Sequence, residues 1–144
     1  MVYGALCFVS AFMGMRYNDF PLGYHADEAS KTRQILSGEY NFYHPLLLLN
    51  TTDLLHQSMG EANDEMAVLL TGRRTSALFA AAAVLCLTLA VHLLYGERAA
   101  TAAGLSVAFC PILVTHAHYM KEDTSLLFGL SAVFLSLAAL RRSG

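Results

Sequence analysis

The sequence predicts an all-α protein that crosses a membrane several times. Hydrophobic residues make up 56% of the 144 residues and charged residues only 14%, against roughly 25% charged residues in soluble domains. The charges are also clustered, because residues 75–95 contain no Asp, Glu, Lys or Arg. As a helix, an apolar segment of this length spans a hydrocarbon core of about 30 Å. We therefore expect a polytopic membrane protein.

Four apolar segments are candidate spans. The first, residues 1–15, is short for a span and lacks the basic leading region and cleavage site of a signal peptide, so we interpret it as the truncated start of a longer helix. The remaining three are residues 75–95, 99–115 and 124–140. Only short charged links, 96–98 and 121–123, separate them, which predicts antiparallel hairpins. We expect residues 1–144 to form a single transmembrane domain fragment with four spans.

Residues 16–74 form a polar stretch that predicts a large outer loop containing short juxtamembrane helices. Asp27 is suited to begin a helix and Gly38 to end one, so we expect a helix between them. The apolar stretch after Pro45 is too short to span and favours a helix lying along the membrane surface. Because spans alternate in direction, this loop and the 121–123 link lie on the same side of the membrane.

Charge and cysteine content narrow the possible partners. The net charge is −2 and the sequence contains no basic run, so we expect no nucleic-acid partner. The three cysteines lie in apolar stretches without metal-ligand spacing, which favours buried free thiols over disulfides. His92 lies alone in an apolar segment, where a helix–helix hydrogen bond is its expected role.

The first candidate site is the acidic pair Asp27-Glu28 in the outer loop. A carboxylate just above a bilayer, in a partly desolvated cleft, is suited to act as a general base that takes a proton from an acceptor hydroxyl. The alternative is structural: Asp27 caps a helix, and Glu28 forms an exposed i,i+3 pair with Lys31. Spacing alone favours this alternative, because caps are common.

The second candidate site is the polar end of the third segment. If its helix continues to residue 123, His116 and Asp123 share one face, at i and i+7. His118 and Glu122 share another face, at i and i+4, and could hold a divalent metal such as zinc or manganese. Two ligands are too few to specify a metal site. The alternative is a span end, where polar side chains meet headgroups and water.

His44 is a weaker candidate because it follows two aromatic residues, Phe42 and Tyr43, that could simply anchor the loop at the membrane interface. Its imidazole could equally approach a phosphate. Composition and spacing by themselves therefore predict a polytopic membrane protein with two acidic patches on one side.

The order of the motifs resembles a known family. In chain order they are Asp27-Glu28, the aromatic segment with His44-Pro45-Leu46, Gly72-Arg73-Arg74-Thr75-Ser76, and Cys110-Pro111 to His118-Tyr119 followed by Asp123. In this order the chain resembles the N-terminal third of the dolichyl-phosphate-mannose–protein mannosyltransferase family. That family is similar to the bacterial lipid A aminoarabinose transferases and belongs to the GT-C fold group. The resemblance covers about residues 17–140.

This resemblance implies a reaction. Such enzymes transfer a sugar from a polyprenyl-phosphate donor to a hydroxyl of a protein, lipid or glycan acceptor, with inversion at the anomeric carbon. Asp27 matches the carboxylate taken as the general base, and Asp123 matches the carboxylate of the second outer loop. Glu28 completes the acidic pair and would position the acceptor. Because family members contain many more spans, this stretch alone would be inactive.

The resemblance also implies a location and further contacts. The active site would face the lumen of the endoplasmic reticulum or the outside of a bacterial or archaeal plasma membrane. Related transferases often carry an acidic-basic pair before a double proline, whereas Tyr43 and His44 stand here before a single proline. His44 is therefore expected at the donor phosphate. The further expected contacts to donor or acceptor are His116, His118 and Lys121.

Two alternatives to an enzyme remain. One is a non-catalytic accessory subunit that keeps the fold without the chemistry. The other is a transporter fragment, in which carboxylates and histidines within the membrane relay ions. The carboxylates lie at the span ends and only His92 lies deep, which disfavours the transporter.

Overall fold

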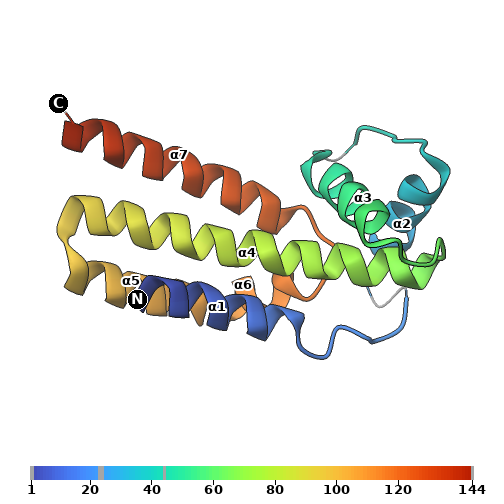
Figure 1. Ribbon diagram of the computed structural model, residues 1–144, viewed down its shortest axis with the longest axis horizontal. Helices are drawn as coiled ribbons and strands as arrows, with labels where there is room; N and C mark the ends of the chain where they lie inside the picture. Colours follow the sequence, from blue (N-terminus) through green and yellow to red (C-terminus); the bar gives the residue numbers. More distant parts are fainter. Residues whose placement is uncertain (1, 23–24, 44, 144) are drawn as a thin grey trace.

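The computed structural model describes residues 2–22, 25–43 and 45–143, which contain seven α-helices and no strand. The helices are α1 (Val2–Met15), α2 (Glu28–Ser37), α3 (Leu47–Met59), α4 (Glu65–Tyr95), α5 (Glu97–Ala108), α6 (Pro111–Ala117) and α7 (Asp123–Ser143). α4 is the central helix and contacts each of the others. α1, α5 and α7 lie along it, α2 and α3 cover its N-terminal part, and both chain termini lie at the opposite end (Figure 1). The prediction of an all-α fold is confirmed.

Two or three of these helices are candidate membrane spans. α4 and α7 are each long and apolar enough to cross a membrane, and the bent pair α5–α6 is a third if it is counted as one span. α1 is apolar but shorter, so the described residues do not give four spans. Large apolar side chains such as Phe8, Phe12 and Phe134 are exposed, as expected for surfaces that contact lipid or further helices.

The segment expected as the third span, residues 99–115, is not one continuous helix. α5 ends at Ala108, α6 begins at Pro111, and their axes are bent by 56°. Proline lacks a backbone N–H and drives the preceding residue out of the helical region. Cys110 is accordingly extended, with φ −65° and ψ 118°. The condition of a helix running on to residue 123 is also not met, because α6 ends at Ala117 and α7 begins at Asp123.

α4 begins well before the expected span of residues 75–95. Asp64 caps it, because its carboxylate accepts hydrogen bonds from the backbone N–H groups of Met66 and Ala67, both at 2.9 Å. Hydropathy marks where a helix enters the membrane, whereas the cap marks where the helix begins. The last part of the expected loop therefore belongs to the helix that carries Arg73.

The two short helices of the outer loop form as expected. α2 begins directly after Asp27, and Gly38 ends it with φ 70°, a left-handed conformation in which its N–H bonds to the carbonyl of Ile35. α3 follows Pro45, and its Leu48 packs in a buried cluster with Leu69 of α4. This cluster holds the outer helices onto α4.

Polar and small residues connect the helices in the apolar layer. The hydroxyl of Tyr3 on α1 lies 2.8 Å from His92 Nδ1 on α4, which confirms the expected helix–helix hydrogen bond. The three cysteines are free, as expected, but they are only half-buried. At Gly104 of α5, an added Cβ would lie 2.7 Å from both Leu6 Cδ1 and Thr88 Oγ1. The Thr88 hydroxyl is held by the carbonyl of Val84 at 2.7 Å, so this close approach requires glycine.

Replacing Gly104 by alanine should lower the free energy of unfolding by about 1–3 kcal/mol, because the added methyl group overpacks the α1–α4–α5 contact. Thermal unfolding in detergent micelles measures this change. Gly129→Ala is the matched control, since its added Cβ meets nothing within 4 Å and alanine is the better helix former by up to about 1 kcal/mol. Equal midpoints for the two variants would contradict the predicted close packing.

Candidate functional site

A fully buried ion pair between Arg73 of α4 and Glu28 of α2 organises the candidate site. Nε and Nη2 of Arg73 donate to the two carboxylate oxygens of Glu28 at 2.9 and 2.7 Å. Both side chains are 0% exposed. A bidentate guanidinium–carboxylate pair is strongly directional, but burying it is costly unless the remaining donors are also bonded.

The remaining donors of Arg73 bind the chain that follows α1. Nη1 donates to the carbonyl oxygens of Asn18 and Phe20, both at 2.7 Å, and Nη2 also donates to Pro21 O at 3.4 Å. These bonds use all five donors of the guanidinium group. Its central carbon also lies 3.6 Å from the centroid of the Phe20 ring. Arg73 therefore fixes the path from α1 to α2 and has no donor left for a substrate phosphate.

The turn between α6 and α7 is attached to the same network. Glu28 Oε1 accepts from the backbone N–H of Met120 at 3.0 Å. Lys31 Nζ donates to Met120 O at 3.2 Å and also forms a partly buried ion pair with Glu122. The alternative of an exposed Glu28–Lys31 pair is therefore wrong, because α2 turns this face toward α4 and the turn.

Asp27 remains accessible beside the buried Glu28. Its side chain is 43% exposed, and although it stands at the N-cap position of α2, it accepts no capping hydrogen bond. One carboxylate oxygen lies 3.9 Å from Nδ1 of His25. The His25 ring packs against Tyr119, with ring centroids 5.2 Å apart. Asp27 thus presents a carboxylate that capping does not occupy, beside the α6–α7 turn.

Asp123 lies in a cluster with His116 and Lys121, which we term the interface cluster. One Asp123 oxygen lies 2.9 Å from His116 Nδ1 and 3.3 Å from Lys121 Nζ. The expected pairing of His116 with Asp123 is therefore present, but it forms across the break between α6 and α7. All three side chains are partly exposed, so a ligand can reach them.

A mainly apolar groove adjoins the interface cluster. Its volume is about 570 Å³, within the range of roughly 300–1,000 Å³ usual for small-ligand sites. Its lining includes Leu87, Val107, Leu113, Leu127, His116 and Asp123. Asp27 is not among its lining residues. The groove therefore joins apolar walls from the spans to the polar groups of the α6–α7 turn.

His118 and Glu122 do not form the expected metal pair. Nδ1 of His118 lies 2.7 Å from the carbonyl oxygen of Val114, so this nitrogen is the donor, and Glu122 pairs with Lys31. Within residues 2–22, 25–43 and 45–143, no group of three or more His, Cys, Asp or Glu side chains is placed to hold a metal ion. These two residues do not fit a metal by themselves, and the metal requirement stays a prediction.

Two further outcomes concern residues outside these contacts. His44 lies outside the described residues, so its expected contact with a donor phosphate stays a prediction. Conversely, the sequence pattern assigned Arg73 no role at the site and placed Lys31 only in an exposed pair with Glu28. The available signal for Arg73 was a charged residue on a mainly apolar helix, which must find a partner when it is buried. The identity of that partner is set by packing between distant segments.

Comparisons with known proteins give no relative for this chain. No protein-family model matches it, and neither a curated protein nor a solved structure matches it.

Removing one partner of the buried ion pair should destabilise the protein strongly. Arg73→Met leaves the Glu28 carboxylate buried without its cation, and we expect a loss of about 3–5 kcal/mol in the free energy of unfolding. Adding Glu28→Leu should recover much of that loss, because no uncompensated charge then remains. Chemical unfolding of the single and double variants measures both effects.

The neighbouring Arg74 is the control, because its pair with Glu61 is partly exposed. Arg74→Met should cost no more than about 1 kcal/mol. A similar loss for Arg73→Met and Arg74→Met would show that burial does not distinguish the two pairs.

Proposed function

We propose that this chain is part of a membrane glycosyltransferase that moves a sugar from a polyprenyl phosphate to an acceptor hydroxyl, with Asp27 as the general base. The observation that carries this proposal is that the Asp27 carboxylate is exposed and makes no capping bond. The next residue in the chain, Glu28, is buried and anchors the backbone at this point. The resemblance to the dolichyl-phosphate-mannose–protein mannosyltransferase family supports the same assignment. Its motif order predicts a base at this position.

The donor would bind at the groove and the interface cluster. The apolar groove suits an isoprenoid tail. The free energy of the tail falls when it leaves water or loosely packed lipid for close contact with the spans. His116 and Lys121 offer N–H donors for the phosphate, and Asp123 orients both, at 2.9 and 3.3 Å. An amphipathic donor therefore matches the change from apolar walls to polar groups.

The acceptor would bind on the other side of the α6–α7 turn. A cavity of about 390 Å³ is lined there by Phe20, His118 and Tyr119, among others. Tyr119 also contacts His25, the neighbour of Asp27. An acceptor hydroxyl in this cavity would lie within reach of the Asp27 carboxylate, with His118 as a further polar contact.

In the proposed reaction, Asp27 takes the proton from the acceptor hydroxyl while the hydroxyl oxygen attacks the anomeric carbon. The bond from that carbon to the phosphate oxygen breaks, and polyprenyl phosphate leaves with the bonding electrons, which inverts the anomeric centre. Glu28 is wholly buried, so it would act as a positioning residue that holds Asp27 and would not contact the acceptor.

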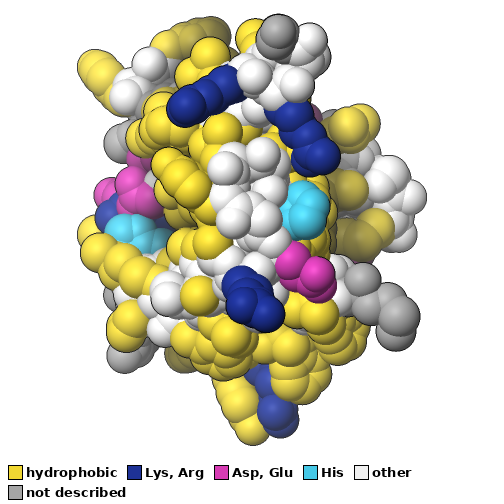
Figure 2. All heavy atoms as spheres, turned by 90° about the vertical axis from the view of Figure 1, so that its left-hand side faces the viewer, with side chains coloured by type: hydrophobic (Ala, Val, Ile, Leu, Met, Phe, Trp, Pro, Cys, Tyr) yellow, Lys and Arg dark blue, Asp and Glu magenta, His cyan; other side chains and the backbone are white. Residues whose placement is uncertain are grey.

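The proposed active site faces the extracytoplasmic or lumenal side of the membrane. Figure 2 views the opposite end of the bundle, where basic side chains lie among apolar ones. α7 carries Arg141 and Arg142 in its last turn, and Arg98 lies near the start of α5. These three are a minority of the nine Lys and Arg residues of the chain, so charge counting does not support this orientation. The resemblance to the mannosyltransferase family supports it. The membrane would be a bacterial or archaeal plasma membrane or that of the endoplasmic reticulum.

Asp27→Asn should lower sugar transfer by about 10²–10⁴-fold, because amide nitrogen and oxygen cannot take up the acceptor proton. The measurement is transfer from radiolabelled polyprenyl-phosphate sugars by the full-length protein in nanodiscs. Asp19→Asn is the matched control, since Asp19 is an exposed carboxylate in the same outer region, and it should retain full activity.

Other outcomes would redirect the assignment. Equal turnover by wild type and Asp27→Asn would remove Asp27 from catalysis. A wild-type protein that binds a donor but transfers no sugar would favour the accessory subunit.

A further inference from the structure

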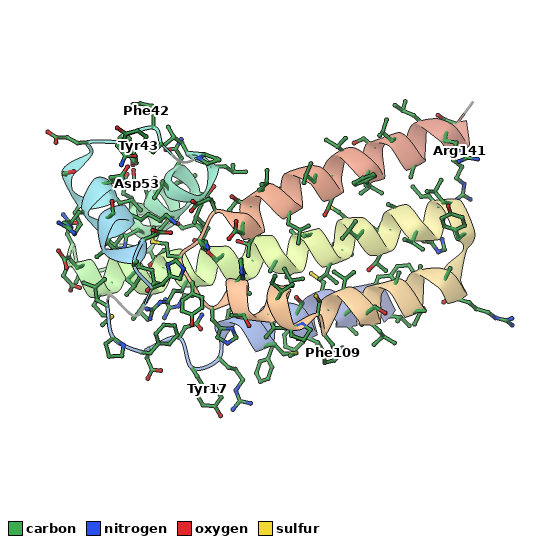
Figure 3. The ribbon with its side chains drawn as sticks, turned by 180° about the vertical axis from the view of Figure 1, so that it is seen from behind. Tyr17, Phe42, Tyr43, Asp53, Phe109 and Arg141 are labelled. Atoms are coloured by element: carbon green, nitrogen blue, oxygen red, sulfur yellow. The ribbon has the colours of Figure 1, made fainter. Side chains whose placement is uncertain are left out.

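A small pocket lies between the last turns of α4 and α7, at the opposite end of the molecule from α2 and α3. Its volume is about 220 Å³. The residues that line it are Leu93, Leu94, Tyr95, Arg141 and Arg142. Figure 3 shows Arg141 at this end, far from Asp53 at the outer end. Neither Asp27 nor any residue of the interface cluster lines this pocket.

The two arginines of the pocket are unengaged. Both side chains are exposed, and neither makes a hydrogen bond or an ion pair with another residue in the described part of the chain. Each guanidinium group carries five N–H donors. The pair therefore presents its donors to whatever occupies the pocket, unlike Arg73, whose donors are all used within the fold.

The pocket lies where a membrane surface is expected. It is formed by the last turns of α4 and α7, the two helices that are each long and apolar enough to span. Leu94 and Leu140 are 40% and 68% exposed at these ends, and Tyr95 is 73% exposed. Figure 2 shows basic side chains among apolar ones on this end of the molecule. Arginine and tyrosine in such a position meet phospholipid headgroups.

The charges around the pocket favour an anion. Both helices present their C-terminal ends here, and each such end carries a partial negative charge of about half an elementary charge. The two guanidinium groups carry a full positive charge each and therefore outweigh the helix ends. Among the described residues that line the pocket there is no Asp or Glu, so no carboxylate neutralises them.

We propose that this pocket binds the phosphate group of an anionic phospholipid, with Arg141 and Arg142 as the hydrogen-bond donors. Hydrogen bonds from guanidinium to phosphate are charge-assisted and frequently bidentate. Basic pockets between membrane helices are suited to anionic headgroups. The choline cation of a zwitterionic headgroup would be repelled by two guanidinium groups, which selects a lipid with net negative charge.

The size of the pocket fits one end of a lipid. Its volume is below the roughly 300–1,000 Å³ of sites that enclose a whole small ligand. The headgroup would therefore occupy the pocket, and the acyl chains would extend from it along the exposed apolar surface of the spans, which includes Leu94.

This site is separate from the transfer reaction proposed above. It shares no residue with the Asp27 site, so it would bind lipid in a protein that transfers no sugar. Conversely, Asp27→Asn should leave lipid binding at this pocket unchanged.

The test is native mass spectrometry of the full-length protein in a neutral detergent, with phosphatidylglycerol or phosphatidylcholine added. We expect wild type to bind one phosphatidylglycerol about tenfold more tightly than phosphatidylcholine, and the double variant Arg141→Gln/Arg142→Gln to lose this preference. Arg98→Gln is the matched control, because Arg98 is an exposed arginine near the start of α5 that does not line the pocket. Its affinity for phosphatidylglycerol should equal that of wild type.

Thermal unfolding without added lipid checks that the double variant is folded. Both arginines are exposed, so the midpoint should equal that of wild type, and a loss of binding then comes from the pocket. Equal affinity of wild type for the two lipids would overturn the proposal. An equal loss in Arg98→Gln would do the same, because it would show general attraction to the membrane surface. Displacement of phosphatidylglycerol by an equal concentration of inorganic phosphate would assign the pocket to a free anion instead.

Discussion

The buried pair of Arg73 and Glu28 is the interaction on which the outer end of this protein depends. Three segments meet at these two side chains: the chain after α1, the first turn of α2, and the turn before α7. Because neither side chain is exposed, each charge depends on the other and on the backbone groups around it. The accessible Asp27 and the interface cluster therefore take their positions from groups that no substrate can touch.

Two kinds of packing divide the molecule along the length of α4. In the apolar layer, small residues such as Gly104 allow close helix contact, and Tyr3 with His92 supplies a polar one. At the outer end, charged and backbone groups add directional contacts, as at Arg73 and Lys31, to the buried apolar cluster of Leu48 and Leu69. A ligand with an apolar tail and a polar head matches the boundary between them, where the groove meets the interface cluster.

The stability of the fold does not explain the environments of Asp27 and His56, because each side chain lacks a stabilising hydrogen bond. Asp27 stands at a helix N-cap without making the capping bond that would stabilise the helix. His56 is buried without a hydrogen-bond partner among the described residues. Departures from locally favourable chemistry are expected where residues serve a ligand instead of the fold.

The sequence by itself determined the features that depend on near neighbours: the all-α class, α2 with its Gly38 end, and the helix–helix role of His92. Hydropathy located α4 but not its start at Asp64. It also did not reveal the break at Pro111, because mean hydropathy does not register a missing N–H. Only the tertiary structure decided that Glu28 pairs with Arg73, 45 residues away, and not with Lys31. Propensity and capping act over a few residues, whereas the partner of a buried charge is fixed by which distant segments pack together.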